Sequence, residues 1–240
     1  MTARKPRGPA CWASSHNAVL HYINHPDPAI EKEARGLARL LKISDERQLD
    51  QTLADVADSQ ISRSRAALHR LAQIRPDDAS RAKVSKALNT TLLDPSRGLS
   101  DESLNALRVW ASGENIDTLV NMLGPYDKAG MGRSARVIEF LGALKDPRAA
   151  SALAPGLDHG RERSLVSMAM KTIGPGVQDV VVPYLDFINP ATRIEACRIL
   201  GEIGTSKSLG ALQKAYDGAG GDPVFSQELV MAMQKIGARK

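Results

Sequence analysis

The sequence has few of the residues from which enzyme pockets and small stabilised domains are usually built. Aromatic side chains make up 4% of its 240 residues, which is little for an active site or for a surface that stacks nucleic-acid bases. It has two cysteines, Cys11 and Cys197, and two thiols so far apart in sequence form neither a disulfide framework nor a zinc site. This cysteine usage is typical of a reducing compartment and predicts a cytoplasmic protein.

Long apolar runs are also missing. No stretch approaches the ~20 consecutive apolar residues of a membrane span, and residues 10–15 are too few and too polar for the core of a signal peptide. The charges of Arg4, Lys5 and Arg7 are expected to lie in a solvated tail, and the abrupt start of the chain is compatible with a piece of a longer protein. We expect residues 1–13 to form a disordered tail and residues 14–240 to form a single repeat domain.

Motifs for catalysis or cofactor binding are lacking as well. There is no G-x-S-x-G elbow for a nucleophilic serine, and the glycine-rich residues 218–221 lack the lysine of a phosphate-binding loop. His21 and His25 have a helical spacing that could suit a metal, but Pro26 is expected to end the helix there. The sequence therefore predicts no catalytic, cofactor-binding or metal-binding residues, and a protein that is not an enzyme.

The most informative stretch is Arg193–Leu212, which reads RIEACRILGEIGTSKSLGAL. Ala196, Ile199, Leu200 and Ile203 share one face of a helix. Gly204 is expected to end this helix in a left-handed conformation. Thr205 or Ser206 would then cap a second helix, so that the stretch forms one helix–turn–helix unit.

Copies of this unit recur along the chain. Helical runs end at intervals of 29 to 39 residues, at Ile43, Ile74, Gly113, Leu144, Ile173, Ile203 and Ile236. Three positions before each end stand Leu40, Leu71, Trp110, Leu141, Met170, Leu200 and Met233. Seven before stand Gly36, Ala67, Ala106, Val137, Val166, Ala196 and Leu229. This stripe predicts an all-α solenoid of about seven helical pairs, because one pair cannot bury its own apolar face.

The repeats differ in regularity along the chain. They are irregular over 14–125, where residues 89–100 are expected to form the longest loop, and regular over 133–240. Turn clusters such as His25-Pro26-Asp27-Pro28, Asn189-Pro190 and Asp222-Pro223 separate one repeat from the next.

Over 133–240 the segments VIEFLGALKDPRAASAL, RIEACRILGEIGTSKSLGAL and LVMAMQKIG resemble HEAT-like repeats of the phycobilisome-lyase type. Arg163 and Arg193 match the arginine of that pattern, and Gly142 and Gly201 match its mid-helix glycine. The resemblance implies a superhelix in which the second helix of each pair lines a concave surface. Repeats of this kind occur in lyase subunits, scaffolds and chaperone-like factors, so they do not define one activity.

Residues five positions before each repeat end are expected to point outward from the second helices. They change polarity from copy to copy, as a face fitted to a partner would, and the charged ones and the histidine are His69, Arg108, Glu139 and Arg198. The sequence thus predicts a non-catalytic scaffold that binds another protein along this face.

An alternative is a nucleic-acid-binding or DNA-repair solenoid similar to the DNA glycosylases of the AlkD type. Residues 63–86 hold seven basic residues against two acidic ones, and the candidate basic patch consists of Arg63, Arg70, Lys83 and Lys86. The concave aromatics of those enzymes have no counterpart, since Trp110 lies on the apolar stripe. A weaker alternative is a chromophore-lyase-type accessory subunit. The His-Glu pairs of di-iron HEAT-repeat hydroxylases are absent.

Overall fold

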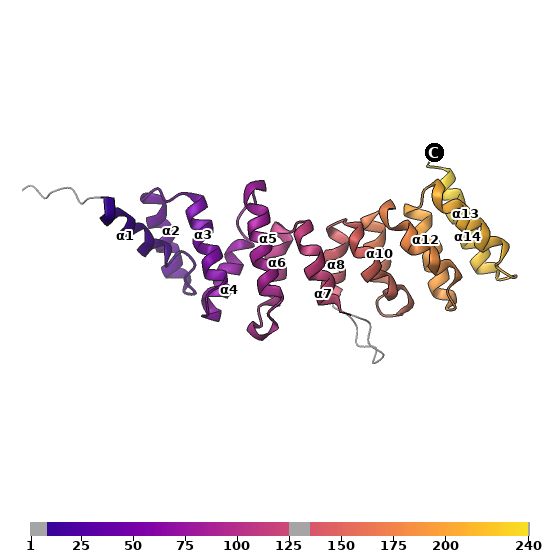
Figure 1. Cartoon of the computed structure of the whole chain (residues 1–240), viewed down its shortest axis with the longest axis horizontal. Helices are drawn as coiled ribbons and strands as arrows, with labels where there is room; N and C mark the ends of the chain where they lie inside the picture. Colours follow the sequence, from indigo (N-terminus) through magenta and orange to yellow (C-terminus); the bar gives the residue numbers. More distant parts are fainter. Residues whose placement is uncertain (1–8, 125–134, 240) are drawn as a thin grey trace, which may run out of the picture. The chain divides into compact units, whose positions relative to one another are not determined.

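The computed structural model describes residues 9–124 and 135–239, and in this part of the chain every regular element is an α-helix or a short 3-10 helix. The all-α class that the repeat predicts is therefore confirmed (Figure 1). The helices belong to two compact units, Met1–Glu114 and Asn115–Lys240. The expected change from irregular to regular repeats, between 125 and 133, lies outside the described residues.

Unit 1 contains three helical pairs, α1 with α2, α3 with α4 and α5 with α6. Across the pairs, α3 packs on α5 and α4 packs on α6, which gives two layers of helices. The helices are α1 (Pro9–Leu20), α2 (Pro28–Leu40), α3 (Asp45–Val56), α4 (Ile61–Leu71), α5 (Asp78–Leu92) and α6 (Ser100–Trp110).

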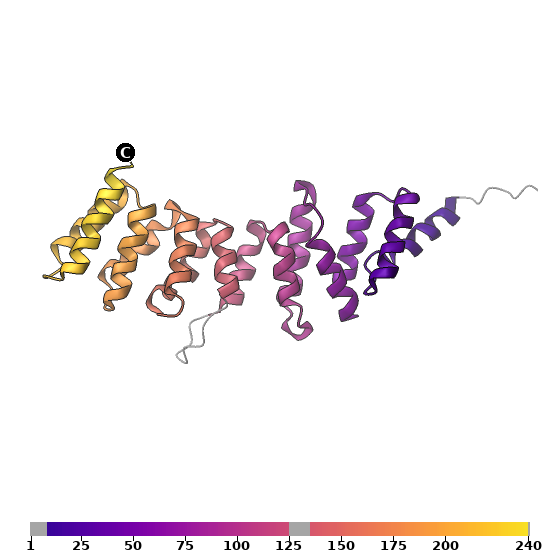
Figure 2. The ribbon, with the colours of Figure 1, turned by 180° about the vertical axis from the view of Figure 1, so that it is seen from behind.

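Unit 2 contains four pairs, so the described residues hold the seven that the sequence predicts. Its second helices α8, α10, α12 and α14 pack one on the next in a row, and the pairs are visible from behind in Figure 2. The helices are α7 (Ile116–Leu123), α8 (Ala135–Ala143), α9 (Ala150–Leu153), α10 (Arg163–Ile173), α11 (Gln178–Val181), α12 (Pro190–Ile203), α13 (Ser206–Asp217) and α14 (Pro223–Gly237).

Two first helices of unit 2 are short and continue as 3-10 helices. The first, α9, continues as η4 (Ala154–Asp158), and α11 continues as η6 (Val182–Asp186). Pro155 and Pro183 stand at the start of these segments. Proline has no N–H to donate to the preceding turn, so the α-helical ladder cannot run through it.

Three second helices begin with an Asp-Pro or Asn-Pro pair. Asp27, Asn189 and Asp222 are the N-caps of α2, α12 and α14, and each side chain accepts a hydrogen bond from a backbone N–H of the first turn. The following proline takes the first helical position, where its missing N–H costs little. The dipeptides that mark breaks between repeats in the sequence are therefore the starts of second helices.

The apolar stripe forms the core of the pairs. Leu71, Trp110, Leu141, Met170 and Leu200 are completely buried. The indole Nε1 of Trp110 donates to the Leu71 carbonyl at 2.8 Å, which satisfies the one polar atom of this side chain. The predicted stripe is thus correct for the second helices from α4 onward at this position, except for the half-buried Met233.

In α2 the predicted stripe is wrong. Leu40 is 80% exposed, whereas Ala38, which was expected to point outward, is 1% exposed. The buried residues of α2 are Ala34 and Ala38, and Ile43 packs with them after the helix has ended. The chain leaves the helix through Lys42, whose φ of 52° turns it back toward the core, so the spacing counted back from Ile43 does not follow one helix.

Three further sequence expectations are corrected. Gly204 has φ −61° and ψ 151°, so it is extended and not left-handed. A Cβ there would lie 2.5 Å from the Leu200 carbonyl oxygen, and this close approach is why glycine fits. Residues 89–100 are not one long loop, because Asn89 lies inside α5. Helix α1 begins at Pro9, within the segment expected to be a tail, of which residues 1–8 lie outside the described part.

Candidate functional site

The charged side chains and the histidine that were predicted to face outward do so on the second helices. His69 on α4, Arg108 on α6, Glu139 on α8 and Arg198 on α12 are all exposed. His69 and Arg108 belong to unit 1, and Glu139 and Arg198 belong to unit 2. In unit 2 the same repeat position also carries Met168 on α10, which is 65% exposed, and Met231 on α14. We call Glu139, Met168, Arg198 and Met231 the second-helix face of unit 2.

Two of the three contacts between neighbouring second helices of unit 2 involve glycine against alanine. A Cβ on Gly142 of α8 would lie 2.8 Å from the Cα of Ala169 on α10. A Cβ on Gly201 of α12 would lie 3.2 Å from the Cα of Ala232 on α14. Small residues at such contacts let two helices pack closely, because the side chains there set the distance between the axes.

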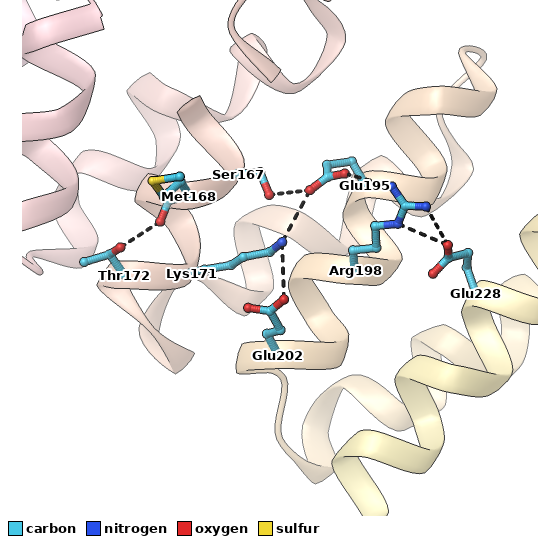
Figure 3. Close-up of polar contacts among 8 residues, drawn as sticks. All are labelled: Ser167, Met168, Lys171, Thr172, Glu195, Arg198, Glu202 and Glu228. Atoms are coloured by element: carbon cyan, nitrogen blue, oxygen red, sulfur yellow. Dashed lines mark hydrogen bonds and ion pairs between the residues drawn. The ribbon is translucent and has the colours of Figure 1, made fainter. Parts of the chain in front are cut away.

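The contact between α10 and α12 is built differently. At the repeat position of Gly142 and Gly201, α10 carries Lys171, and at the position of Ala169 and Ala232, α12 carries Ile199. Here an open polar groove of about 480 Å³ lies between the two helices. Its lining consists of Ser164 and of six residues drawn in Figure 3: Ser167, Met168, Lys171, Thr172, Glu195 and Glu202. We call it the α10–α12 groove.

Glu195 is the centre of the polar contacts in this groove. Its Oε1 atom accepts a hydrogen bond from the Ser167 hydroxyl and lies 3.5 Å from Lys171 Nζ. The same ammonium is 3.4 Å from a carboxylate oxygen of Glu202 (Figure 3). The Glu195 side chain is 15% exposed, so these contacts are partly shielded from water. Because its oxygens are already bound from two helices, Glu195 joins α10 to α12.

Arg198 extends this network to the next helix. Its guanidinium donates to Glu228 Oε1 of α14 at 2.7 and 3.1 Å and lies 3.6 Å from Glu195 Oε2. The hydrogen bond to Glu228 is the main reason why the pKa of Arg198 is raised. This side chain therefore stays charged on the exposed surface while it is held in one orientation.

The groove offers groups for recognition and none arranged for covalent chemistry. The Ser167 hydroxyl donates to a carboxylate, and a serine nucleophile needs a stronger base within reach, such as a histidine. Exposed methionine, hydroxyl, ammonium and carboxylate groups side by side suit the binding of another polar and apolar surface.

The two arginines of the repeat pattern have structural contacts. The Arg163 Nε atom donates to the Leu157 carbonyl at 2.7 Å, which ties the start of α10 to η4. The Arg193 guanidinium lies 4.8 Å from the centre of the Phe225 ring and 3.5 Å from Asp222, the N-cap of α14. Both arginines therefore hold neighbouring helices together within unit 2.

The candidate basic patch is divided in the structure. Arg63 and Arg70 lie on α4, whereas Lys83 and Lys86 lie on α5 in the other layer. The partners differ accordingly: Arg63 is 3.6 Å from Asp58, and Lys83 is 2.5 Å from Asp50 of α3.

Two other arginines of the same stretch are also paired with acidic side chains. Arg65 bonds Glu102 of α6 at 2.8 Å, and Arg81 lies 3.8 Å from Asp78. The basic residues between 63 and 86 thus do not form a continuous row of unpaired charges. Lys86 is exposed, but it lies on α5, whereas Arg70 lies on α4.

Metal ligands do not gather in the described part of the chain, where no group of three or more His, Cys, Asp or Glu side chains could hold an ion. The ring nitrogens of His21 lie 3.2 and 2.9 Å from the Arg63 guanidinium, which leaves a poor site for a cation. Among the same residues, no helix has the length and apolar character needed to cross a membrane.

Comparisons with known proteins give likeness of fold only. No protein-family model matches the chain, and no curated protein sequence matches it. A crystal structure of an engineered protein matches with 14% identity and a TM-score of 0.46, over 79% of this chain and 96% of the other. A structure of human deoxyhypusine hydroxylase in complex with glycerol matches with 17% identity and a TM-score of 0.39, over 95% and 98%. At these scores neither likeness carries an argument about function.

The α10–α12 groove was missed by sequence reasoning, which looked at the outward position alone. Its signal is nonetheless present, because Lys171 breaks a column in which the neighbouring regular repeats have glycine. A charged residue at a position of close helix contact needs room and partners, and Glu195 and Glu202 provide the partners.

Proposed function

We propose that this chain is a protein-interaction module that acts without catalysis of its own and binds a partner protein through the second-helix face of unit 2. One observation carries the proposal: exposed Met168, Arg198 and Met231 stand at the same position of the consecutive helices α10, α12 and α14, beside the α10–α12 groove. Methionine and arginine are enriched in protein interfaces, and flexible methionines adapt to different partner shapes.

The charges of this face support a role in specificity. Arg198 is fixed by two glutamates, and Lys171 by two as well, so a partner meets a preset pattern of charge. Such patterns act mainly on the choice of partner and on the association rate. We further propose a reducing, cytoplasmic location, which fits the free thiol of Cys197.

The alternatives have less support. Nucleic-acid binding needs several free cations along the phosphate backbone, and four of the basic residues in 63–86 are paired with acids. The role of a chromophore-lyase accessory subunit rests on the repeat resemblance alone, and no contact among the described residues of unit 2 favours it.

The experiment is affinity capture from the native host followed by a binding measurement with the purified partner. The test variant is Met168→Glu with Met231→Glu, because Arg198 is bound to two glutamates and its reversal would also disturb helix packing. The control is Ile188→Glu, which changes an equally apolar side chain that is 96% exposed in the turn before α12.

We expect a partner protein that binds the wild-type chain and the Ile188→Glu variant and is lost with the double variant, while all three keep the same helicity and melting temperature. Equal binding by all three, or recovery of nucleic acid that competes with the protein, would contradict the proposal.

A further inference from the structure

Besides the α10–α12 groove of unit 2, the structure has a polar pocket in unit 1. It lies between the turn before α2 and one face of α4. Its volume is about 350 Å³. Residues 62, 65, 66, 69, 70 and 73 line it from α4 and its end, at the spacing of one helical face. The polar groups that matter here are those of His25, Glu31, Ser62, Arg65, His69 and Arg70.

The one acid among these lining residues is already bound. Glu31 lies 2.5 Å from the guanidinium of Arg35, which also donates to the Ile23 carbonyl at 2.8 Å. Arg65 forms an ion pair with Glu102 of α6 at 2.8 Å, so its charge is also compensated. Arg70 therefore has no carboxylate in hydrogen-bond or ion-pair contact, and the charges of Glu31 and Asp45 act on it only from farther away.

Arg70 has no hydrogen-bond or ion-pair partner within the described residues 9–124 and 135–239. It is half-buried, and its pKa is lowered, first by burial and then by the nearby charge of Arg35, while the charges of Glu31 and Asp45 offset this only in part. A guanidinium that is partly removed from water and close to another cation is costly unless an anion compensates it.

We propose that this pocket binds a phosphate monoester through the Arg70 guanidinium, the imidazoles of His25 and His69 and the hydroxyl of Ser62. Arginine presents a planar fork of N–H donors that fits phosphate oxygens. The two imidazoles and the hydroxyl add donors from other directions, as a tetrahedral dianion requires. The proposal is independent of the proposed function, because the pocket lies in unit 1 and the second-helix face in unit 2.

The surroundings favour a monoester over a carboxylate or a nucleic acid. A planar carboxylate is satisfied by one arginine and leaves the other donors unused. A nucleic-acid backbone would need further free cations beside the pocket, but Arg63 and Arg65 are paired with Asp58 and Glu102. A volume of about 350 Å³ also leaves room for the alcohol that carries the phosphate.

The test is an NMR titration of the full chain in which the histidine ring protons are observed. The probes are glycerol phosphate, a phosphoserine peptide, the same peptide with serine, inorganic phosphate and acetate. We expect saturable shifts of His25 and His69 with phosphate monoesters, and none of His159, which lies in unit 2. Tighter binding of glycerol phosphate would assign the site to small molecules, and tighter binding of the phosphopeptide would assign it to a modified protein.

Arg70→Gln should weaken monoester binding roughly tenfold or more, because a charge-assisted hydrogen bond is lost. The matched control is Arg75→Gln, an exposed arginine after α4 that does not line the pocket. If Arg70→Gln unfolds, the exposed His69→Gln carries the same test. Absence of saturable shifts, equal binding of acetate, or equal affinity of Arg70→Gln and Arg75→Gln would overturn the proposal.

Discussion

Gly142 on α8 leaves no room for a side chain beside Ala169 on α10. A Cβ atom on the glycine would lie 2.8 Å from the alanine Cα and 2.9 Å from its Cβ. The nearest atoms are the Cα and Cβ of Ala169, which are fixed to the backbone of a packed helix. They cannot move aside as the end of a long side chain can. This pair therefore fixes how closely α8 and α10 approach each other.

Gly142→Ala should lower the free energy of unfolding by about 1–3 kcal/mol, as overpacking in a core does. The control is Gly210→Ala on α13, where a Cβ meets nothing within 4 Å. Alanine is the better helix former, so this change should raise stability by up to about 1 kcal/mol. Urea titrations of both variants would measure the difference, and a shift of the same sign in both would contradict it.

Leu141→Ala and Leu200→Ala should each cost roughly 2–5 kcal/mol, because both leucines are completely buried and their loss leaves a cavity. Leu40→Ala should change stability by less than about 0.5 kcal/mol, since this leucine is largely exposed at the end of α2. Denaturant unfolding of the three variants tests the corrected repeat positions. A large loss of stability in Leu40→Ala would show that Leu40 is buried, as the sequence predicts.

Glu195→Ala should destabilise unit 2 by about 1–3 kcal/mol, because it leaves Ser167 and Lys171 without a shared acceptor in a partly buried place. Glu202→Ala is the matched control, since Glu202 contacts the same Lys171 but is 51% exposed. Its loss should cost less than about 1 kcal/mol, as for a surface ion pair. Thermal melts at low and high salt would separate the two, and equal losses would disprove the central place of Glu195.

Cys197 should resist thiol reagents in the folded chain. Burial, with a smaller effect of Glu228, raises the pKa of its thiol from 9.0 to about 12, and only the thiolate reacts. In a Cys11→Ser chain, which keeps this thiol alone, we expect labelling at about pH 8 only after unfolding in urea. Rapid labelling of the folded chain would contradict the burial of Cys197.

The same pKa shift predicts a dependence of stability on pH. Above pH 9 the unfolded chain loses the thiol proton and the folded chain keeps it, so stability from this group is complete below pH 9 and falls toward pH 12. The stability difference between Cys11→Ser and Cys11→Ser with Cys197→Ala should therefore decrease over that range. A constant difference would show that the thiol titrates alike in both states.

The helical repeat could be predicted because its signal is local. Apolar residues at helical spacing and breaks at Asn189-Pro190 and Asp222-Pro223 depend only on neighbours in the sequence. Where the chain leaves the helix early, as at Lys42 in αL conformation, counting residues gives the wrong face, and Leu40 is the result.

The sites could be predicted only in part. Exposure of His69 and Arg198 follows from helical geometry, but Glu228, which binds Arg198, comes from another helix. The basic stretch shows the limit most clearly, because the sequence sums charges along one segment while Arg65 and Lys83 meet acids of α6 and α3. The pocket proposed to bind a phosphate monoester is formed by the turn at residues 25–26 together with α4, and no local sequence pattern predicts that these segments meet.

Lys171 in the place of a glycine also has a mechanical consequence. The contacts of α8 with α10 and of α12 with α14 depend on close apolar packing, whereas α10 and α12 are joined across a groove by ion pairs. Ion pairs that line an open groove weaken as salt screens them, and close-packed apolar contacts do not. Under tension along the row of second helices, unit 2 should therefore yield first between α10 and α12, and at a lower force as ionic strength rises.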